Sequence, residues 1–208
     1  MSKCLIVVGS RREGNSLKLA QKIKKELKKE RIISNIIVPG NQKIYVCTGC
    51  MDCDINGVCD FYDDMISNIE KVNNSDTIIF ITPTRWNLLS GDIKIFMDRL
   101  NPLYVPQKLK NKKAIVIAIG GSSAENFSTN GAVSSIDSFC ENSKMKLVLK
   151  CQINNCLEAD DIENKDEEVN KIINDIKNKL KTYNWFTHFL KNAIIKLSNV
   201  IYIIDIKV

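Results

Sequence analysis

Five short apolar segments, separated by helical segments, constrain the fold of this chain more than any other feature. Each is a nearly continuous apolar run, which is typical of a strand covered on both faces. Strands that alternate with helices imply crossover connections and a parallel sheet. We therefore expect an α/β fold, a three-layer sandwich around a five-stranded parallel sheet. The expected strands are Leu5–Val8, Ile32–Val38, Thr77–Ile81, Ala114–Ile119 and Lys146–Gln152.

The segments between these strands carry apolar residues at helical spacing. In the first of them, Leu17, Ile23 and Leu27 belong to one apolar stripe with lysines opposite, as in an amphipathic helix. Ser16 is the expected N-cap of that helix. Further helices are expected at Asp63–Val72, Gly91–Leu100, Gly131–Glu141 and Glu167–Tyr183.

The alternation ends near residue 183, which divides the chain into two parts. Residues 1–183 are expected to form one domain. Residues 184–208 form a C-terminal extension in which Trp185, Phe189 and Leu197 belong to one apolar helical face. Three roles fit such a face: docking on the domain itself, oligomerisation and, in third place, peripheral contact with a membrane.

Charge and hydropathy exclude several functions. The net charge of +6 comes from 25 Lys and only 5 Arg, and these residues are spread along helices instead of gathered on one face, so nucleic-acid binding is not expected. The N-terminus has no signal-peptide pattern. No uncharged stretch reaches the roughly 18 residues of a membrane helix, so no integral membrane segment is expected. We expect a cytoplasmic protein with reduced thiols.

The loop after the first strand, Gly9–Ser16, has the composition of an anion site. Ser10, Asn15 and Ser16 offer side-chain donors, and Arg12 adds positive charge. The N-terminus of the following helix contributes partial positive charge and free N–H groups. The loop matches neither the Walker A motif nor the G-x-G-x-x-G fingerprint. A serine-capped helix after an ordinary turn is the alternative interpretation.

This loop resembles the Gly-Ser-x-Arg-x-x-Gly-Asn-Ser/Thr stretch of the flavodoxin-like NADPH-dependent FMN reductases, which holds the FMN phosphate there. A second stretch is also similar: Thr82-Pro83-Thr84-Arg85-Trp86 is followed by Ser90-Gly91-x-x-Lys94 and Asp98-Arg99. The resemblance implies a flavodoxin-like fold and bound FMN. It also implies that the segment after the proline borders the isoalloxazine ring, that a glycine pair flanks its other side, and that the helix beginning at Gly91 helps form a dimer. The implied FMN-binding residues are Ser10, Arg12, Asn15, Ser16, Leu17, Pro83, Thr84, Arg85, Trp86, Asn87, Gly120 and Gly121.

Arg85 departs from the family pattern, which usually has an aromatic residue there. Two interpretations are open. A cation beside the ring would stabilise the anionic reduced flavin, whereas a side chain that points to solvent would have no redox role.

Four of the eight cysteines lie within thirteen residues, as Cys47, Cys50, Cys53 and Cys59. The C-x2-C-x2-C-x5-C spacing is related to the C-x2-C-x2-C run of bacterial ferredoxins, whereas structural zinc sites more often pair two C-x2-C units across a longer insert. The spacing therefore favours a [4Fe–4S] cluster, with free redox-active thiols and zinc as alternatives. The other four, Cys4, Cys140, Cys151 and Cys156, are expected to be buried and to act as small apolar residues.

The cysteine segment resembles that of the iron–sulfur flavoproteins, an anaerobe-associated branch of the same family, and the likeness covers roughly residues 3–150. It implies a homodimer or homotetramer in which the cluster of one chain lies near the flavin of a neighbour. The first hypothesis is an FMN- and [4Fe–4S]-containing oxidoreductase that passes electrons between a ferredoxin-like donor and a two-electron acceptor. No side chain is expected to be catalytic, because the cofactors carry the chemistry.

Two alternatives remain at this point. One is an NAD(P)H-dependent FMN or quinone reductase without a cluster. The other is a zinc-stapled interaction protein without flavin.

Overall fold

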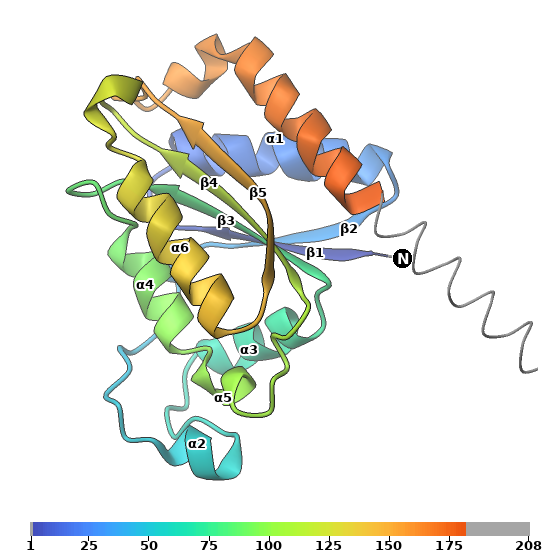
Figure 1. The fold of residues 1–208 in the computed structure, drawn as a ribbon, viewed down its shortest axis with the longest axis vertical. Coiled ribbons are helices and arrows are strands. Elements are labelled where there is room, and N and C mark those ends of the chain that lie inside the picture. The colour runs from blue at the N-terminus through green and yellow to red at the C-terminus, as the bar shows by residue number, and fades with distance from the viewer. Residues whose placement is uncertain (1, 182–208) are drawn as a thin grey trace, which may run out of the picture.

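The computed structural model describes residues 2–181, which fold around one parallel sheet (Figure 1). The five strands pair in the order β2-β1-β3-β4-β5. The strands are β1 (Lys3–Val8), β2 (Ile33–Ile37), β3 (Thr77–Pro83), β4 (Lys113–Ile119) and β5 (Lys146–Ile153). The expected α/β fold and five-stranded parallel sheet are confirmed, and each strand lies within a few residues of its predicted range.

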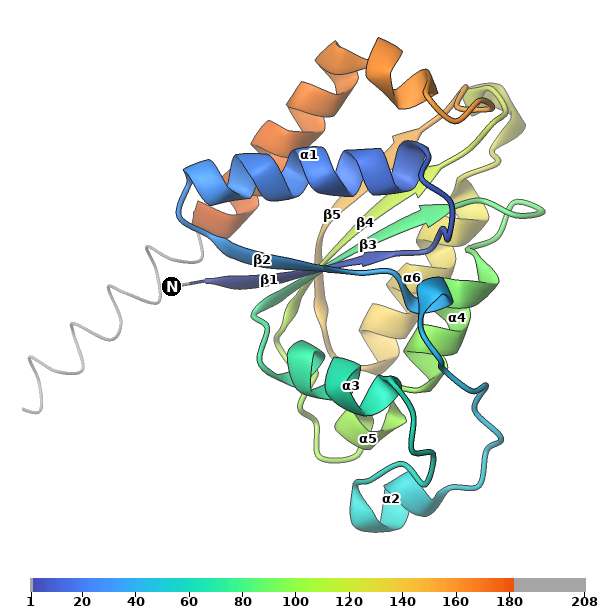
Figure 2. The same ribbon diagram turned by 180° about the vertical axis from the view of Figure 1, so that it is seen from behind.

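Helices cover both faces of the sheet (Figure 2). The helix α1 and a helix over residues 166–181 lie on one face, and α3, α4 and α6 lie on the other. The helix bounds are α1 (Asn15–Lys29), α2 (Asp52–Asn56), α3 (Met65–Asn73), α4 (Gly91–Asp98), α5 (Asn101–Tyr104) and α6 (Asn130–Asn142). Short 3-10 turns lie at Pro39–Asn41, Ala124–Asn126 and Asp161–Asn164.

Two apolar cores follow from the alternation of side chains along each strand. Ile6 and Val8 of β1 pack beneath α1 and the helix over residues 166–181. Leu5 and Val7 of the same strand pack on the other face, against α3, α4 and α6. Because both faces are covered, β1 reads as an unbroken apolar run in the sequence.

Several local predictions are corrected. The N-cap of α1 is Gly14, not Ser16, and Ser16 lies in the first turn of the helix. The helix α3 begins at Met65 and not at Asp63, because the Asp63 carboxylate already accepts the amide of Met65 at 2.9 Å and ends the preceding loop. The short helices α2 and α5 were not predicted.

Two predictions fall partly or wholly outside the described residues. The last helix is described only as far as residue 181, so its predicted end at Tyr183 lies beyond them, and so does the predicted extension over residues 184–208. Within the described part of the chain, no helix is both long and apolar enough to cross a bilayer.

Candidate functional site

A cavity of about 360 Å³ opens where β1, β3 and β4 end. In a doubly wound sheet the ligand site lies outside the carboxyl ends of the strands, where the strand order reverses. In the order β2-β1-β3-β4-β5 that point lies between β1 and β3. The cavity is lined by Ser10, Arg12, Asn15, Ser16, Pro83, Thr84, Arg85, Ile119, Gly121, Cys156 and Leu157.

One wall is the loop between β1 and α1. Ser10, Asn15 and Ser16 are buried although they are polar, and the first turn of α1 contains no acidic residue. Free N–H groups and the helix dipole therefore face the cavity without a competing carboxylate, which suits an anionic group.

The two arginines of this loop have different environments. The Arg11 guanidinium forms an ion pair with Asp92 at 2.9 Å and does not line the cavity, whereas Arg12 does line it. The hydrogen bond to Asp92 raises the pKa of Arg11. Among the described residues, Arg12 is therefore the arginine of this loop placed to meet a ligand.

Asn15 has partners that the sequence did not suggest. Its Nδ2 donates to the carbonyl of Glu158 at 2.6 Å, and its Oδ1 accepts the amide of Ile162 at 3.0 Å. The side chain thus ties the segment after β5 to the start of α1. Asn15 lines the cavity as a residue that holds this segment in place, and one of the two N–H groups of its side-chain amide is occupied by Glu158.

The segment after β5 supplies a wall that sequence reasoning missed. Cys156 and Leu157 line the cavity, and the amide of Cys156 donates to the Gly120 carbonyl at 2.9 Å. Lys18 on α1 pairs with Asp160 at 2.5 Å and Glu163 at 2.7 Å. The acidic run after the fifth strand was the available signal, because that strand ends at the same edge of the sheet.

The opposite wall begins at the end of β3 with Pro83, Thr84 and Arg85. The backbones of Arg85 and Leu88 exchange two hydrogen bonds of 2.9 Å. Trp86 and Asn87, between them, have positive φ values of 50° and 61°, which is the geometry of a two-residue type I′ hairpin.

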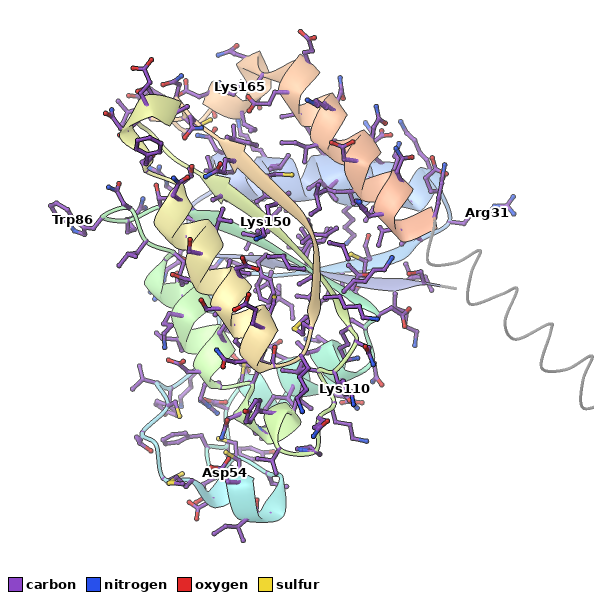
Figure 3. All side chains as sticks on the ribbon, in the orientation of Figure 1. Arg31, Asp54, Trp86, Lys110, Lys150 and Lys165 are labelled. Atoms are coloured by element: carbon purple, nitrogen blue, oxygen red, sulfur yellow. The ribbon has the colours of Figure 1, made fainter. Side chains whose placement is uncertain are left out.

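Trp86 stands at the tip of this hairpin with 98% of its surface exposed, pointing away from the body of the molecule (Figure 3). Neither Trp86 nor Asn87 lines the cavity. A tryptophan in the left-handed region is uncommon, so the turn depends on close packing with its surroundings. The Asn87 carbonyl packs against Gly131, where the Cβ of any other residue would lie 2.2 Å from the carbonyl oxygen.

The remaining predicted FMN-binding residues are Gly120, Gly121 and Leu17, of which only Gly121 lines the cavity. Gly120 lies behind it, where an added Cβ would meet Ser128 Oγ at 2.5 Å. Leu17 is half-buried and packs against the core beneath α1.

The cysteine segment lies away from this cavity. The helix α2, which contains Cys53, lies beyond the sheet at one end of the molecule in both ribbon views (Figures 1 and 2). In Figure 3, the label of Asp54 on this segment lies far from that of Trp86 on the hairpin. The cysteines of the segment do not line the cavity.

The backbone of this segment turns sharply at left-handed residues. The helix α2 begins after Met51 and ends at Gly57, with φ values of 68° and 74°, and Gly49 has a φ of 71°. Glycine adopts this region without steric cost. The loop therefore folds back on itself at both glycines.

The four thiols have different exposures. Cys47 and Cys50 are exposed, Cys59 is intermediate and Cys53 is buried. Within residues 2–181, the group of candidate ligand atoms lying within 4.8 Å of one another joins Cys50 to Asp52 and Asp60. A tetrahedral zinc site would place its sulfur atoms about 3.8 Å apart, and no such group of thiols occurs in this part of the chain.

A buried ion pair closes the base of the cysteine segment. Arg99, at the end of α4, donates to Asp63 through Nη1 at 2.7 Å and Nη2 at 3.0 Å. The two side chains are 1% and 0% exposed. Burial favours the neutral carboxyl, but the bonds from Arg99 and from the amides of Tyr45 and Met65 outweigh it and lower the pKa of Asp63. This pair fixes the two ends of the segment next to each other.

The other four cysteines are buried, as predicted. Burial raises the pKa of Cys4 and of Cys140 to about 12, and the pKa of Cys151 and of Cys156 to about 11. These thiols therefore remain protonated and unreactive at neutral pH.

Comparison with known proteins gives the family. The model of the NADPH-dependent FMN reductase family matches residues 2–151. An iron–sulfur flavoprotein of Methanocaldococcus jannaschii is 31% identical over 121 residues, which are 58% of this chain and 63% of the relative. An iron–sulfur flavoprotein of Archaeoglobus fulgidus is 32% identical over 111 residues, 53% of this chain and 50% of that protein. The match thus spans about half to two thirds of the length of these relatives.

Solved structures agree on the fold. A flavone reductase superposes with a TM-score of 0.65 at 18% identity, covering 83% of this chain and 59% of its own. An NADH:FMN oxidoreductase superposes with a TM-score of 0.61 at 18% identity, covering 86% and 88%. The chain therefore belongs to the NADPH-dependent FMN reductase family of flavin-dependent oxidoreductases, where it is similar to the proteins named iron–sulfur flavoproteins.

Proposed function

We propose that this protein holds FMN in the cavity at the β1–β3 edge and a [4Fe–4S] cluster on the cysteine segment. It would pass electrons between a one-electron, ferredoxin-like donor and a two-electron acceptor. The observation that carries the flavin half is the cavity itself, because it gathers residues from loops far apart in the sequence. Eight of the twelve residues predicted to bind FMN line it: Ser10, Arg12, Asn15, Ser16, Pro83, Thr84, Arg85 and Gly121.

The cavity suits FMN at both of its ends. The phosphate would lie at the first turn of α1, with Ser10, Ser16 and Arg12 as donors. The ring would lie against Pro83–Arg85 and Gly121, beside the apolar Ile119 and Leu157. FMN supplies both one-electron and two-electron chemistry, and these residues bind it, orient it and limit access of water.

The four clustered thiols support the part of the proposal that concerns the [4Fe–4S] cluster. Cys47, Cys50, Cys53 and Cys59 are the compact thiol set that an iron–sulfur cube uses. The Arg99–Asp63 pair already holds the two ends of this segment. Relatives in two archaea carry the name iron–sulfur flavoprotein, which favours the same cofactor here.

The separation of cavity and cysteines within one chain supports an oligomer. Electron transfer between the two cofactors requires them to be close, so we propose that a second copy brings its cysteine segment to the cavity, in a homodimer or homotetramer. Large apolar side chains are exposed at both places: Trp86, Phe127 and Leu157 near the cavity, and Met51, Ile55 and Val58 on the segment.

Light scattering should find two or four chains per particle, and a monomer at micromolar concentration would contradict this arrangement.

The cofactors are tested by anaerobic absorption and EPR spectroscopy with iron, sulfide and flavin counts. We expect one FMN and four irons per chain. The Cys50→Ala variant should lose the iron and keep the flavin, whereas Cys140→Ala, which changes a buried core thiol, should keep both. Protein that has neither the flavin band near 450 nm nor acid-labile sulfide after reconstitution would exclude the proposal.

A second function is favoured by one observation, namely that the cavity includes none of the four clustered cysteines. A flavin bound there has a complete site without the cluster. The chain would then act as an NAD(P)H-dependent FMN or quinone reductase. Undiminished NAD(P)H oxidation by the Cys50→Ala variant, with quinone as acceptor, would favour this function over the first.

A further inference from the structure

Two side chains with nitrogen donors, at the junction of α4 and α5, lie against the cysteine segment. Arg99 is the C-cap of α4, and Asn101 is the first residue of α5. The Nδ2 atom of Asn101 lies 3.1 Å from Cys53 Sγ and 2.6 Å from Asp54 Oδ1. Cys53 is 9% exposed, so this contact is largely shielded from water.

Arg99 approaches the segment from the same junction. Its guanidinium donates to the Tyr45 carbonyl at 2.7 Å and to Asp63, and its Cζ lies 4.9 Å from the centre of the Phe61 ring. Tyr45 precedes the cysteines and Phe61 and Asp63 follow them. One side chain therefore holds both ends of the segment.

The Nε–H of Arg99 is buried without a hydrogen-bond partner among the described residues. A buried donor without a partner is destabilising, so this atom calls for an acceptor. This Nε–H lies at the base of the cysteine segment, beside the bonds that Arg99 makes to Tyr45 and Asp63. Arg99 thus keeps one buried donor available there.

Hydrogen bonds to sulfur ligands change an iron–sulfur centre in a defined direction. An N–H dipole aimed at a thiolate stabilises negative charge, and the reduced cluster is more negative than the oxidised one by one electron. Such donors therefore raise the reduction potential. They also fix the orientation of the ligand side chains, which slows the loss of metal.

We propose that Asn101 and Arg99 are positioning residues for a [4Fe–4S] cluster. Asn101 donates an N–H hydrogen bond to the sulfur of Cys53 and sets the reduction potential through it. Arg99 holds the two ends of the cysteine segment and so closes it around the centre. This inference rests on the cluster of the proposed function.

The decisive variant is Asn101→Leu, which keeps the side-chain size and removes the donor. Its matched control is Asn142→Leu, because the Asn142 amide donates to the Ser138 carbonyl at 2.8 Å instead of to a cysteine sulfur. Both variants are reconstituted anaerobically beside the unchanged protein, and the potentials of cluster and FMN are measured in EPR-monitored redox titrations. We expect the cluster potential to become more negative in Asn101→Leu only, and the FMN potentials to be unchanged in both.

Arg99 is tested by Arg99→Lys, which keeps the charge and removes the forked contact. We expect about tenfold faster loss of iron to a chelator, in line with other residues that orient metal ligands. Apo-protein gives a separate measurement, since residues 45–63 should exchange amide hydrogen faster in this variant. Should Arg99→Lys fail to fold, the Asn101→Leu titration still tests whether the hydrogen bond to Cys53 sets the cluster potential.

The outcomes separate this inference from the proposed function. If the cluster is bound and its potential is the same in Asn101→Leu and in the unchanged protein, the role of Asn101 is overturned and the proposal of a cluster is not. Unchanged protein that takes up FMN but no iron would overturn the cluster, and this role with it.

Discussion

At the scale of single residues, placement separates side chains that look alike in the sequence. Arg11 and Arg12 are neighbours in one loop, yet Arg11 is paired with Asp92 and Arg12 lines the cavity. Asp63 and Asp98 both pair with a cation, but the Asp63–Arg99 pair is buried and the Lys94–Asp98 pair is exposed. Removal of one partner should therefore cost more stability in the buried pair than in the exposed pair.

The arginine pair gives a prediction about FMN affinity. Arg12→Ala should weaken FMN binding about tenfold, because a charged hydrogen bond to phosphate contributes on the order of 1.5 kcal/mol at a partly exposed site. Arg11→Ala should leave the affinity unchanged. Fluorescence titration of the apo-protein with FMN measures both, and equal losses in the two variants would contradict the assignment.

The buried pair gives a prediction about stability and its pH dependence. Asp63→Asn should reduce the free energy of unfolding by about 3–5 kcal/mol, because it leaves the Arg99 charge buried without a counter-ion. Asp98→Asn, which breaks the exposed pair with Lys94, should reduce the free energy of unfolding much less. Urea unfolding at pH 7 measures the difference.

The pH dependence follows from the lowered pKa of Asp63 in the folded state. A carboxyl whose folded pKa lies below its unfolded value, about 3.9, stabilises the fold above that pH. The stabilisation is lost as the pH falls through the folded pKa. The gap between the unchanged protein and Asp63→Asn should therefore narrow below about pH 4, and a constant gap would contradict the ionised pair.

At the scale of elements, the cysteine segment and the hairpin at Trp86 are the parts that the strand–helix pattern did not describe. Both depend on left-handed residues and on support from elsewhere. Gly131 on α6 makes room for the carbonyl of Asn87, and the end of α4 holds the cysteine segment. Each loop is thus shaped by a contact with a residue that lies at least 36 residues further along the chain, at Arg99 for Asp63 and at Gly131 for Asn87.

The burial of the thiols predicts their chemistry in apo-protein under anaerobic conditions. Iodoacetamide at pH 8 should label the exposed Cys47 and Cys50 first. The four core cysteines should resist until the protein unfolds, since burial raises the pKa of each to about 11 or 12 and only the thiolate reacts.

Peptide mass spectrometry identifies the labelled positions. Reconstitution with iron and sulfide should then protect Cys47, Cys50, Cys53 and Cys59 together. Protection of only two of them would indicate a different centre.

At the scale of the whole molecule, the helix over residues 166–181 is held to α1 by ion pairs across the same face of the sheet. Lys177 pairs with Glu26 at 2.8 Å, and Lys181 pairs with Glu30 at 2.9 Å. Hydrogen bonds from Lys177 and Lys29 lower the pKa of Glu26 to about 2. This contact secures the end of the described chain to its beginning.

The lowered pKa of Glu26 predicts how this docking responds to acid. The contribution of Glu26 is complete above its unfolded pKa, about 4.3, and disappears as the pH falls through about 2. Glu26→Gln should therefore speed amide exchange of residues 166–181 at pH 7, and the difference from the unchanged protein should shrink as the pH falls from about 4 towards 2. Hydrogen-exchange mass spectrometry measures this, and added salt should reduce the effect.

The sequence by itself determined the fold class, the parallel sheet and the donor groups that the two motifs contain. Hydrophobic periodicity is a local property, and strands covered on both faces must be continuously apolar. The spacing of the four cysteines and the donors of the Gly9–Ser16 loop are likewise contained within short segments. These features can therefore be predicted without coordinates.

Only the tertiary structure decided which side chains meet across the chain. It engaged Asn15 with the segment after β5, added Cys156 and Leu157 to the cavity, and set Trp86 outside it. It also brought Asn101 to Cys53, 48 residues away in the sequence. Such contacts depend on how the strand ends and helix ends come together in packing, and no local pattern records that geometry.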